Sequence, residues 1–257
     1  LKDIKNFAGT SSGSQVAALL ALGYSVDELN DILFNTPFKE FMDSDTSYCY
    51  NFLQFFWSYG YYKGIYLRNY LESLIKKKLQ KDNATFLDLW KHNGNHLKVT
   101  GTCLEKKKLI IFDYINSPEM EISTALHISS CIPFFFKPVK YKNFTYVDGG
   151  CLRNFPANIF NNKQGKTLAI ELIAEDEKDI YEIDSLKTFT FSLVNTIHSA
   201  VNQVEIDKEK VNIIRINTGD VSAIDFDISF EKKNELIKNS YLITKKTLEK
   251  NIDDKLD

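Results

Sequence analysis

Residues 5–22 join a strand end, a glycine-rich turn and an apolar helix in immediate succession. The turn runs from Gly9 through Ser11 to Gly13, and Ser14–Leu22 behind it is apolar nearly all round, as in a helix that is buried on most sides. A serine on such a sharp strand-to-helix turn can be held in a strained backbone conformation with its hydroxyl exposed. Ser11 is therefore a candidate nucleophile, with Gly9 and Gly13 allowing strand and helix to approach closely.

Two other interpretations of this turn remain open. The serines could cap the helix that follows them. The turn could instead cradle a phosphate group at the helix N-terminus. A Walker-type loop would place a lysine before the Ser or Thr, and this turn has none.

Asp148 is the candidate base for such a serine. It ends the strand predicted over Phe144–Val147 and is followed by Gly149 and Gly150, which permit tight backbone geometry. Ligands bind at strand ends in α/β sheets, so a carboxylate there can take the proton of the nucleophile directly. A plain turn is the alternative for this motif.

A Ser-Asp-His triad fits the sequence less well. In α/β-hydrolases the histidine follows the acid along the chain. Here only His198 follows Asp148, and it falls inside the long helix predicted over Leu186–Asp207.

Strands and helices alternate along the chain. Further helices are predicted over Val26–Phe34, Ile65–Lys78, Thr85–Trp90, Ile122–Ser130 and Glu231–Asn251, and further strands over Leu97–Cys103, Lys108–Asp113, Thr167–Ile173 and Val211–Ile216. This alternation predicts an α/β fold with a mainly parallel central sheet covered by helices on both sides. We find no break that marks a second domain and expect one domain over residues 1–257.

Composition excludes several functional classes. The net charge of −2 offers no basic surface for nucleic acid, and no apolar run approaches the roughly 20 residues of a transmembrane segment. The four cysteines are scattered and favour reduced thiols, as in a cytoplasmic protein. His92 and His96 have the spacing of a helical metal pair, but Asn93-Gly94-Asn95 breaks the helix, so we expect no metal site.

Three blocks in order then resemble the patatin-like phospholipase family. The first is Gly9-Thr10-Ser11-Ser12-Gly13 with its apolar helix. The second is Ser129-Ser130-Cys131-Ile132-Pro133 with Phe136 and Pro138, and the third is Tyr146-Val147-Asp148-Gly149-Gly150 with Asn154-Phe155-Pro156. The joint pattern is far more specific than any one block.

The resemblance implies a three-layer α/β/α patatin-like fold and hydrolysis of acyl esters by a Ser-Asp dyad without histidine, metal or other cofactor. By position, Ser11 is the nucleophile and Asp148 the base. The implied substrate is a phospholipid or another acyl lipid, with peripheral contact at membranes. Phe135 and Phe136 would lie beside the site and line an acyl pocket.

One departure from the family concerns the region before Gly9. The family carries a first strand and a glycine-rich oxyanion loop upstream of the elbow, and both are missing here. Loss of a single oxyanion donor lowers rates by ~10²–10³-fold. We therefore expect weak ester hydrolysis by residues 1–257 alone and stronger hydrolysis by a longer form.

Two other functions compete with lipid hydrolysis. The same dyad could serve an esterase or thioesterase with a soluble substrate. Without its oxyanion loop the domain could also be a non-catalytic lipid-binding module, although such a module has no need of both Ser11 and Asp148. For the aromatic cluster Phe55-Phe56-Trp57 with Tyr59, Tyr61 and Tyr62, core packing is favoured over a lipid-contacting role.

Overall fold

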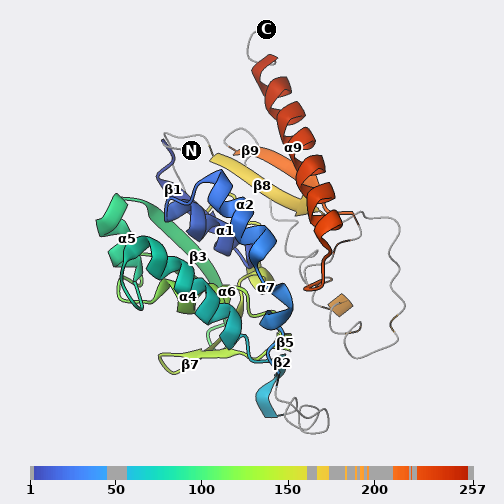
Figure 1. Ribbon diagram of the computed structural model, residues 1–257. Helices are drawn as coiled ribbons and strands as arrows, with labels where there is room; N and C mark the ends of the chain where they lie inside the picture. The colour runs from blue at the N-terminus through green and yellow to red at the C-terminus, as the bar shows by residue number, and fades with distance from the viewer. Residues whose placement is uncertain are drawn as a thin grey trace. The chain divides into compact units, whose positions relative to one another are not determined.

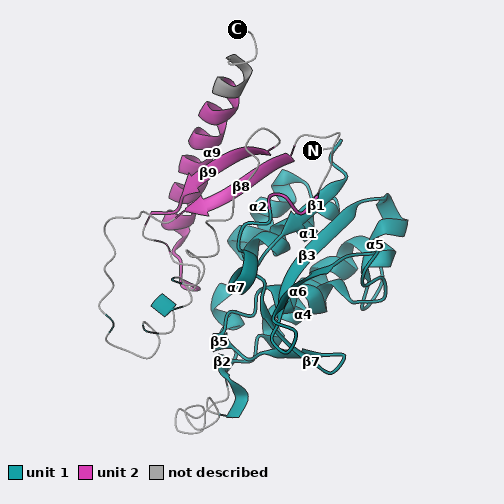
Figure 2. Cartoon of the chain, turned by 180° about the vertical axis from the view of Figure 1, so that it is seen from behind, with its two compact units in different colours: residues 1–156, 183–204 teal, residues 157–182, 205–257 magenta. Residues whose placement is uncertain are grey.

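The computed structural model describes residues 3–44, 57–160, 167–173, 183, 189, 192–193, 196, 211–219, 221 and 225–253. They belong to two compact units, residues 1–156 with 183–204 (unit 1) and residues 157–182 with 205–257 (unit 2) (Figure 2). The helix predicted over Leu186–Asp207 lies largely outside the described residues. His198, Phe55 and Phe56 lie outside them as well.

Unit 1 is built on a five-stranded sheet with β3 at its centre (Figure 1). Its strands are β1 (Asn6–Gly9), β3 (His96–Cys103), β4 (Lys108–Phe112), β6 (Val139–Tyr141) and β7 (Phe144–Asp148). The order is β1-β3-β7-β6, with β4 also paired to β3. A separate parallel pair joins β2 (Gly60–Tyr62) to β5 (Phe134–Phe136).

Connection length explains which strands run parallel. β1 and β3 pair in parallel because the chain between them crosses over through several helices. β3–β4 and β6–β7 are antiparallel hairpins, closed by turns that hold Lys107 and Asn143 at positive φ. β7 also pairs antiparallel with β3. The predicted α/β class is confirmed, and parallel pairing is found at β1–β3, at β2–β5 and in unit 2.

The helices of unit 1 begin and end where the sequence signals are strongest. They are α1 (Ser12–Ala21), α2 (Val26–Asn35), η1 (Phe38–Phe41, a 3₁₀ helix), α4 (Ile65–Leu79), α5 (Phe86–Asn93), α6 (Ile122–Ser129) and α7 (Gly150–Arg153). A capping box at Ser25 and Glu28 opens α2, and a second box at Thr85 and Asp88 opens α5.

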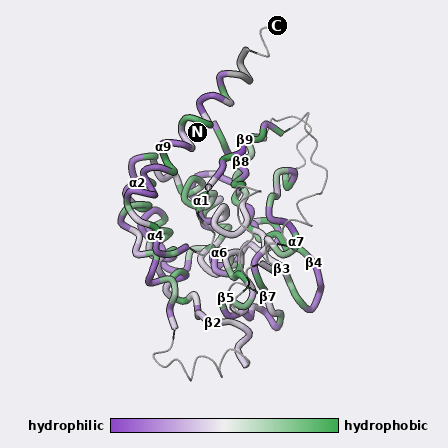
Figure 3. The backbone as a smooth tube through the Cα atoms, turned by 90° about the vertical axis from the view of Figure 1, so that its right-hand side faces the viewer, coloured by the Kyte–Doolittle hydropathy of each residue, from purple (hydrophilic) through white to green (hydrophobic). Residues whose placement is uncertain are grey.

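Helices cover both faces of β3. Its side chains alternate between the two faces. A Cβ on Gly101 would lie 2.6 Å from Ile128 of α6, so that helix presses directly on the backbone of the strand. Thr100 points the other way, toward Gly149 and α7. Figure 3 shows hydrophobic colouring along α1 inside unit 1 and long hydrophilic stretches along α4 and α9.

Unit 2 contains one parallel strand pair and one long helix. β8 (Thr167–Ile173) pairs along its whole length with β9 (Val211–Asn217), and α9 (Phe230–Asp253) packs on β9. Among the described residues, no helix combines the length and the apolar character needed to cross a bilayer.

Candidate active site

Ser11 lies between β1 and α1. Its backbone has φ 52° and ψ −131°, a conformation that residues other than glycine rarely adopt. Such a backbone conformation lowers the free energy of unfolding by about 1–3 kcal/mol, and it persists only where the surrounding structure holds it. Two side-chain hydrogen bonds hold Ser11, in addition to the Ser14 N–H that donates to its carbonyl at 2.9 Å. The Ser11 N–H donates to Ser129 Oγ at 3.0 Å, and the Ser14 hydroxyl donates to the Ser11 carbonyl at 2.6 Å.

The strand and the helix approach each other closely at Gly9. A Cβ on Gly9 would lie 2.3 Å from the carbonyl oxygen of Gly13, which no side chain can tolerate. A Cβ on Gly13 would meet nothing within 4 Å. The expected steric need for a small residue therefore holds at Gly9 but not at Gly13, because the close contact runs through the Gly13 backbone.

Sheet register brings Asp148 to the same place from the other side of β3. Gly9, the last residue of β1, pairs with Val99, and Asp148, the last residue of β7, pairs with Gly101. β1 runs parallel to β3 and β7 runs antiparallel to it. Both strands therefore end beside the same short stretch of β3, and the loops that follow converge there.

The hydroxyl of Thr100 joins these two loops. Thr10 Oγ1 lies 2.7 Å from Thr100 Oγ1 and donates to the carbonyl of Arg153 at 3.1 Å. Because the Thr10 proton is used on Arg153, Thr100 is the donor to Thr10. A Cβ on Gly149 would lie 2.2 Å from Thr100 Oγ1, so only glycine fits there. The elbow and the segment after Asp148 are thus fixed to one buried threonine.

Asp148 is a buried carboxyl with an unsatisfied oxygen. Its Oδ1 accepts from the Gly150 N–H at 2.6 Å, while Oδ2 has no hydrogen-bond partner among the described residues. Burial raises the pKa of Asp148 from 3.8 to about 7, although the Ser11 hydroxyl and the Gly150 N–H both lower it. The hydroxyl that affects this carboxyl is therefore that of the strained serine.

The three described histidines make other contacts. His96 Nε2 lies 3.0 Å from Asp113 Oδ2, and His92 lies on α5 while His96 begins β3, so the two share no helix. His127 packs against Gly64, and its Nε2 has no partner among the described residues. Burial, with a smaller effect of Arg68, lowers the pKa of His127 to about 4.

The segment from Cys131 to Phe136 connects Asp148 with a cluster of aromatic rings. The Cys131 carbonyl accepts the Asp148 N–H at 2.9 Å. Phe136 is buried, Phe135 is half-buried, and the ring of Phe135 lies 4.9 Å from that of Tyr62. Phe135 and Phe136 thus follow by four and five residues the Cys131 carbonyl that binds Asp148, and they lie on β5, paired with β2.

Sequence reasoning missed the residues that hold the site together. These residues are Ser129, Thr10 and Thr100. Their segments predicted a helix, the serine turn and a strand, and sequence alone predicted no role for the three hydroxyl groups. A signal existed for Thr100, since a threonine inside a strand of the core needs a hydrogen-bond partner when it is buried. The signal for Ser129 was weaker, because its partner is a backbone amide 118 positions away.

Comparison with known proteins shows the family of the chain. The model of the family described as patatin-like phospholipase matches residues 1–161. The probable lipid hydrolase 463L of invertebrate iridescent virus 6 is 30% identical over 93% of the chain and 83% of that protein. The uncharacterized protein R571 of Acanthamoeba polyphaga mimivirus is 28% identical over 92% of the chain and 80% of its own length.

The crystal structure of VipD from Legionella pneumophila has the same fold. The superposition gives a TM-score of 0.70 at 15% sequence identity and covers 97% of the chain. The chain corresponds to 62% of the VipD chain. At that identity the likeness extends to the fold, and it confirms the patatin-like architecture predicted from the motifs.

Replacing Ser129 with alanine should slow the reaction of Ser11 with a fluorophosphonate probe by about 10- to 100-fold. The variant leaves the Ser11 N–H without its acceptor and loosens the strained elbow. Ser130→Ala is the matched control, because the neighbouring hydroxyl binds Gln15 instead. Equal labelling rates in the two variants, with equal melting temperatures, would show that Ser129 does not position the serine.

Proposed function

Because the chain belongs to the patatin-like phospholipase family, we propose that it is a lipid acyl hydrolase, with Ser11 as nucleophile and Asp148 as general base. The substrate is a phospholipid or a similar acyl lipid, and the products are a free fatty acid and the deacylated lipid. The reaction uses neither a histidine nor a metal ion.

The observation that carries this proposal is the unsatisfied oxygen of Asp148. A buried carboxyl normally uses both oxygens in hydrogen bonds. Here Oδ1 is held by the Gly150 N–H, while Oδ2 is buried and unpartnered among the described residues. With a pKa of about 7, Asp148 can be ionised near neutral pH and still accept a proton.

The first half of the cycle forms an acyl-enzyme. Asp148 Oδ2 accepts the Ser11 proton as Ser11 Oγ attacks the ester carbonyl. The tetrahedral intermediate then collapses, the bond to the alcohol breaks, and Asp148 returns the proton to the leaving oxygen. The lipid minus one acyl chain departs, and the chain remains esterified to Ser11.

The second half repeats these steps with water. Asp148 accepts a proton from the water molecule as the water oxygen attacks the acyl carbonyl. Collapse of the second intermediate breaks the bond to Ser11 Oγ, which takes back the proton from Asp148. The fatty acid leaves and the dyad is restored.

The first backbone amides of α1 are the proposed oxyanion donors within this chain. Amides at a helix N-terminus have no intrahelical acceptor and favour negative charge. We assign this role to the N–H groups of Ser12 and Gly13, because the Ser11 N–H already binds Ser129. The upstream glycine-rich loop, the single domain over residues 1–257 and the weak activity of these residues alone stay predictions.

We also propose a cytoplasmic location with peripheral contact at membranes. Its support is the state of the cysteines, since Cys103, Cys131 and Cys151 are all free thiols. A membrane surface is where the substrate of a phospholipid hydrolase is found.

The dyad predicts that Ser11→Ala and Asp148→Asn each lower phosphatidylcholine hydrolysis by about 10³-fold or more, because both groups act in the same step. Ser73→Ala, which removes an exposed hydroxyl on α4, should stay within about threefold of the unaltered chain.

The measurement is fatty-acid release from mixed micelles, with a fluorophosphonate label located by mass spectrometry. Labelling at Ser11 that survives in Asp148→Asn at the original rate would rule out Asp148 as the base. Full activity on short soluble esters with none on micelles would favour the esterase alternative.

Phe135 is proposed to line the acyl pocket. Its half-buried ring packs on Tyr62, and it lies four residues after Cys131, whose carbonyl binds the Asp148 N–H, so Phe135→Ala should enlarge the pocket. We expect the ratio of kcat/KM for long over short acyl esters to change by about threefold to tenfold. Phe144→Ala, at the start of β7, is the control. A loss of thermal stability with an unchanged ratio would remove Phe135 from the pocket.

A further inference from the structure

Three exposed aromatic side chains gather at the start of the β2–β5 strand pair. Trp57 is 84% exposed, Tyr59 66% and Phe134 42%. Gly60 pairs with Phe134 in parallel register, so the residues that precede and open the two strands lie at one edge. We call these three residues the aromatic tip. The core packing expected for Trp57 and Tyr59 is wrong.

The backbone holds the aromatic tip in place. Tyr59 has φ 59° and Phe134 has φ 65°, a region that L side chains seldom occupy. A Cβ on Gly60 would lie 2.3 Å from the Phe136 carbonyl, so the two strands can pair this closely only because position 60 is glycine. Exposure of the tip is thus built into the strand pairing at an energetic cost of about 1–3 kcal/mol per strained residue.

The segments around the tip are rich in lysine, although the Asp43 carboxylate accepts from the Gly64 N–H at 2.6 Å just after β2. Residues 57–64 and 129–147 contain four lysines, Lys63, Lys137, Lys140 and Lys142, and not one aspartate or glutamate. The whole chain carries a net charge of −2, so this stretch departs from the average. Lys140 and Lys142 are exposed on the β6–β7 hairpin.

The neighbouring β3–β4 turn extends the basic surface. Its Leu104 N–H donates to the Thr145 carbonyl at 3.0 Å, which holds the turn beside the β6–β7 hairpin. Lys106 Nζ lies 4.0 Å from the centre of the Phe144 ring. The one acid of this turn, Glu105, accepts from the Thr145 N–H and adds one negative charge beside the three lysines that follow it.

The aromatic tip is linked to the candidate dyad through one short segment. Phe134 lies three residues after Cys131, whose carbonyl accepts the Asp148 N–H. Phe135 and Phe136, the proposed acyl pocket, follow Phe134 directly. Phe134 of the tip and the proposed acyl pocket therefore belong to the same strand, β5.

We propose that the aromatic tip inserts into the surface of an anionic lipid bilayer, with Lys140 and Lys142 of the β6–β7 hairpin, which follows β5 along the chain, binding headgroup phosphates. Tryptophan and tyrosine side chains favour the interface between water and hydrocarbon, and each lysine near an anionic surface contributes about 1 kcal/mol. The excess of lysines over acidic side chains in these segments is what favours an anionic partner. This inference rests on the proposed function for its choice of lipid as the partner.

The test follows Trp57 fluorescence in the full chain carrying Ser11→Ala and Trp90→Phe, since the chain has two tryptophans. Vesicles of phosphatidylcholine mixed with phosphatidylglycerol should shift the emission to the blue and allow quenching by brominated acyl chains. Vesicles of phosphatidylcholine alone should do so more weakly, and high salt should reduce the difference.

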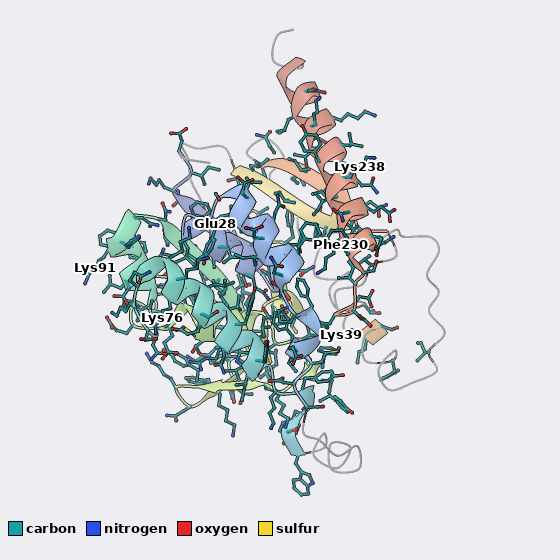
Figure 4. The ribbon with its side chains drawn as sticks, in the orientation of Figure 1. Glu28, Lys39, Lys76, Lys91, Phe230 and Lys238 are labelled. Carbon is teal, nitrogen blue, oxygen red and sulfur yellow. The ribbon has the colours of Figure 1, made fainter. Side chains whose placement is uncertain are left out.

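Sedimentation with the same vesicles then compares variants. Trp57→Ser with Phe134→Asn should weaken partitioning by about tenfold or more, and Lys140→Glu with Lys142→Glu should weaken it only for the anionic vesicles. Tyr241→Ser and Lys238→Glu are the controls, because both side chains are exposed on α9 in unit 2 (Lys238 is labelled in Figure 4). Neither control should change partitioning.

The outcomes separate this inference from the proposed function. Vesicle binding by the Ser11→Ala chain would support insertion of the aromatic tip into a bilayer, even if the unaltered chain hydrolyses no lipid. Tip variants that keep hydrolysis of a short soluble ester and lose vesicle binding would support both. Equal partitioning of the tip variants and the controls, or no blue shift with either vesicle, would overturn the inference and leave the tip to a protein partner.

Discussion

Burial of the Asp148 carboxyl beside a strained serine is the constraint on which the rest of this site depends. Burial favours the protonated form and raises the pKa of Asp148 from 3.8 to about 7. Because the folded-state pKa lies above the ordinary value, the contribution of Asp148 to stability is fully present below about pH 4 and is lost as pH rises through about 7. The fold thus gives up stability at neutral pH to hold a base that is strong enough to take a proton from Ser11.

Much of the surrounding structure serves to keep these two groups together. β3 lies between β1 and β7, so two strands whose last residues are 139 positions apart end beside Val99–Gly101. The Thr10–Thr100 hydrogen bond and the Ser11–Ser129 hydrogen bond then fix the loops that the register brings together. Close packing at Gly9 and Gly149 leaves no room for side chains there. Strain at Ser11 is tolerated because the strand, helix and loop around it are each held independently.

The sequence predicted the parts of this site that have a local cause. The capping box at Ser25, the elbow at Ser11 and the strand end at Asp148 each follow from neighbouring residues, and the order of the three motifs indicated the family. Contacts between distant segments did not follow in the same way. The Ser129 hydroxyl, the role of Thr100 and the exposure of Trp57 depend on strand register and on helix placement, which residue type alone does not encode. Gly13 illustrates the difference, since its place in the motif suggested a steric need that the backbone contact does not impose on its own Cβ.

The pH dependence of Ser11 phosphonylation tests the central claim most directly. If Asp148 is the base, the rate of fluorophosphonate labelling should rise with pH and level off above about 7, because only the ionised carboxylate can accept the serine proton. Asp148→Asn should label slowly and show no such rise. A rise with the same midpoint that persists in Asp148→Asn would contradict the account, since another group would then be activating Ser11.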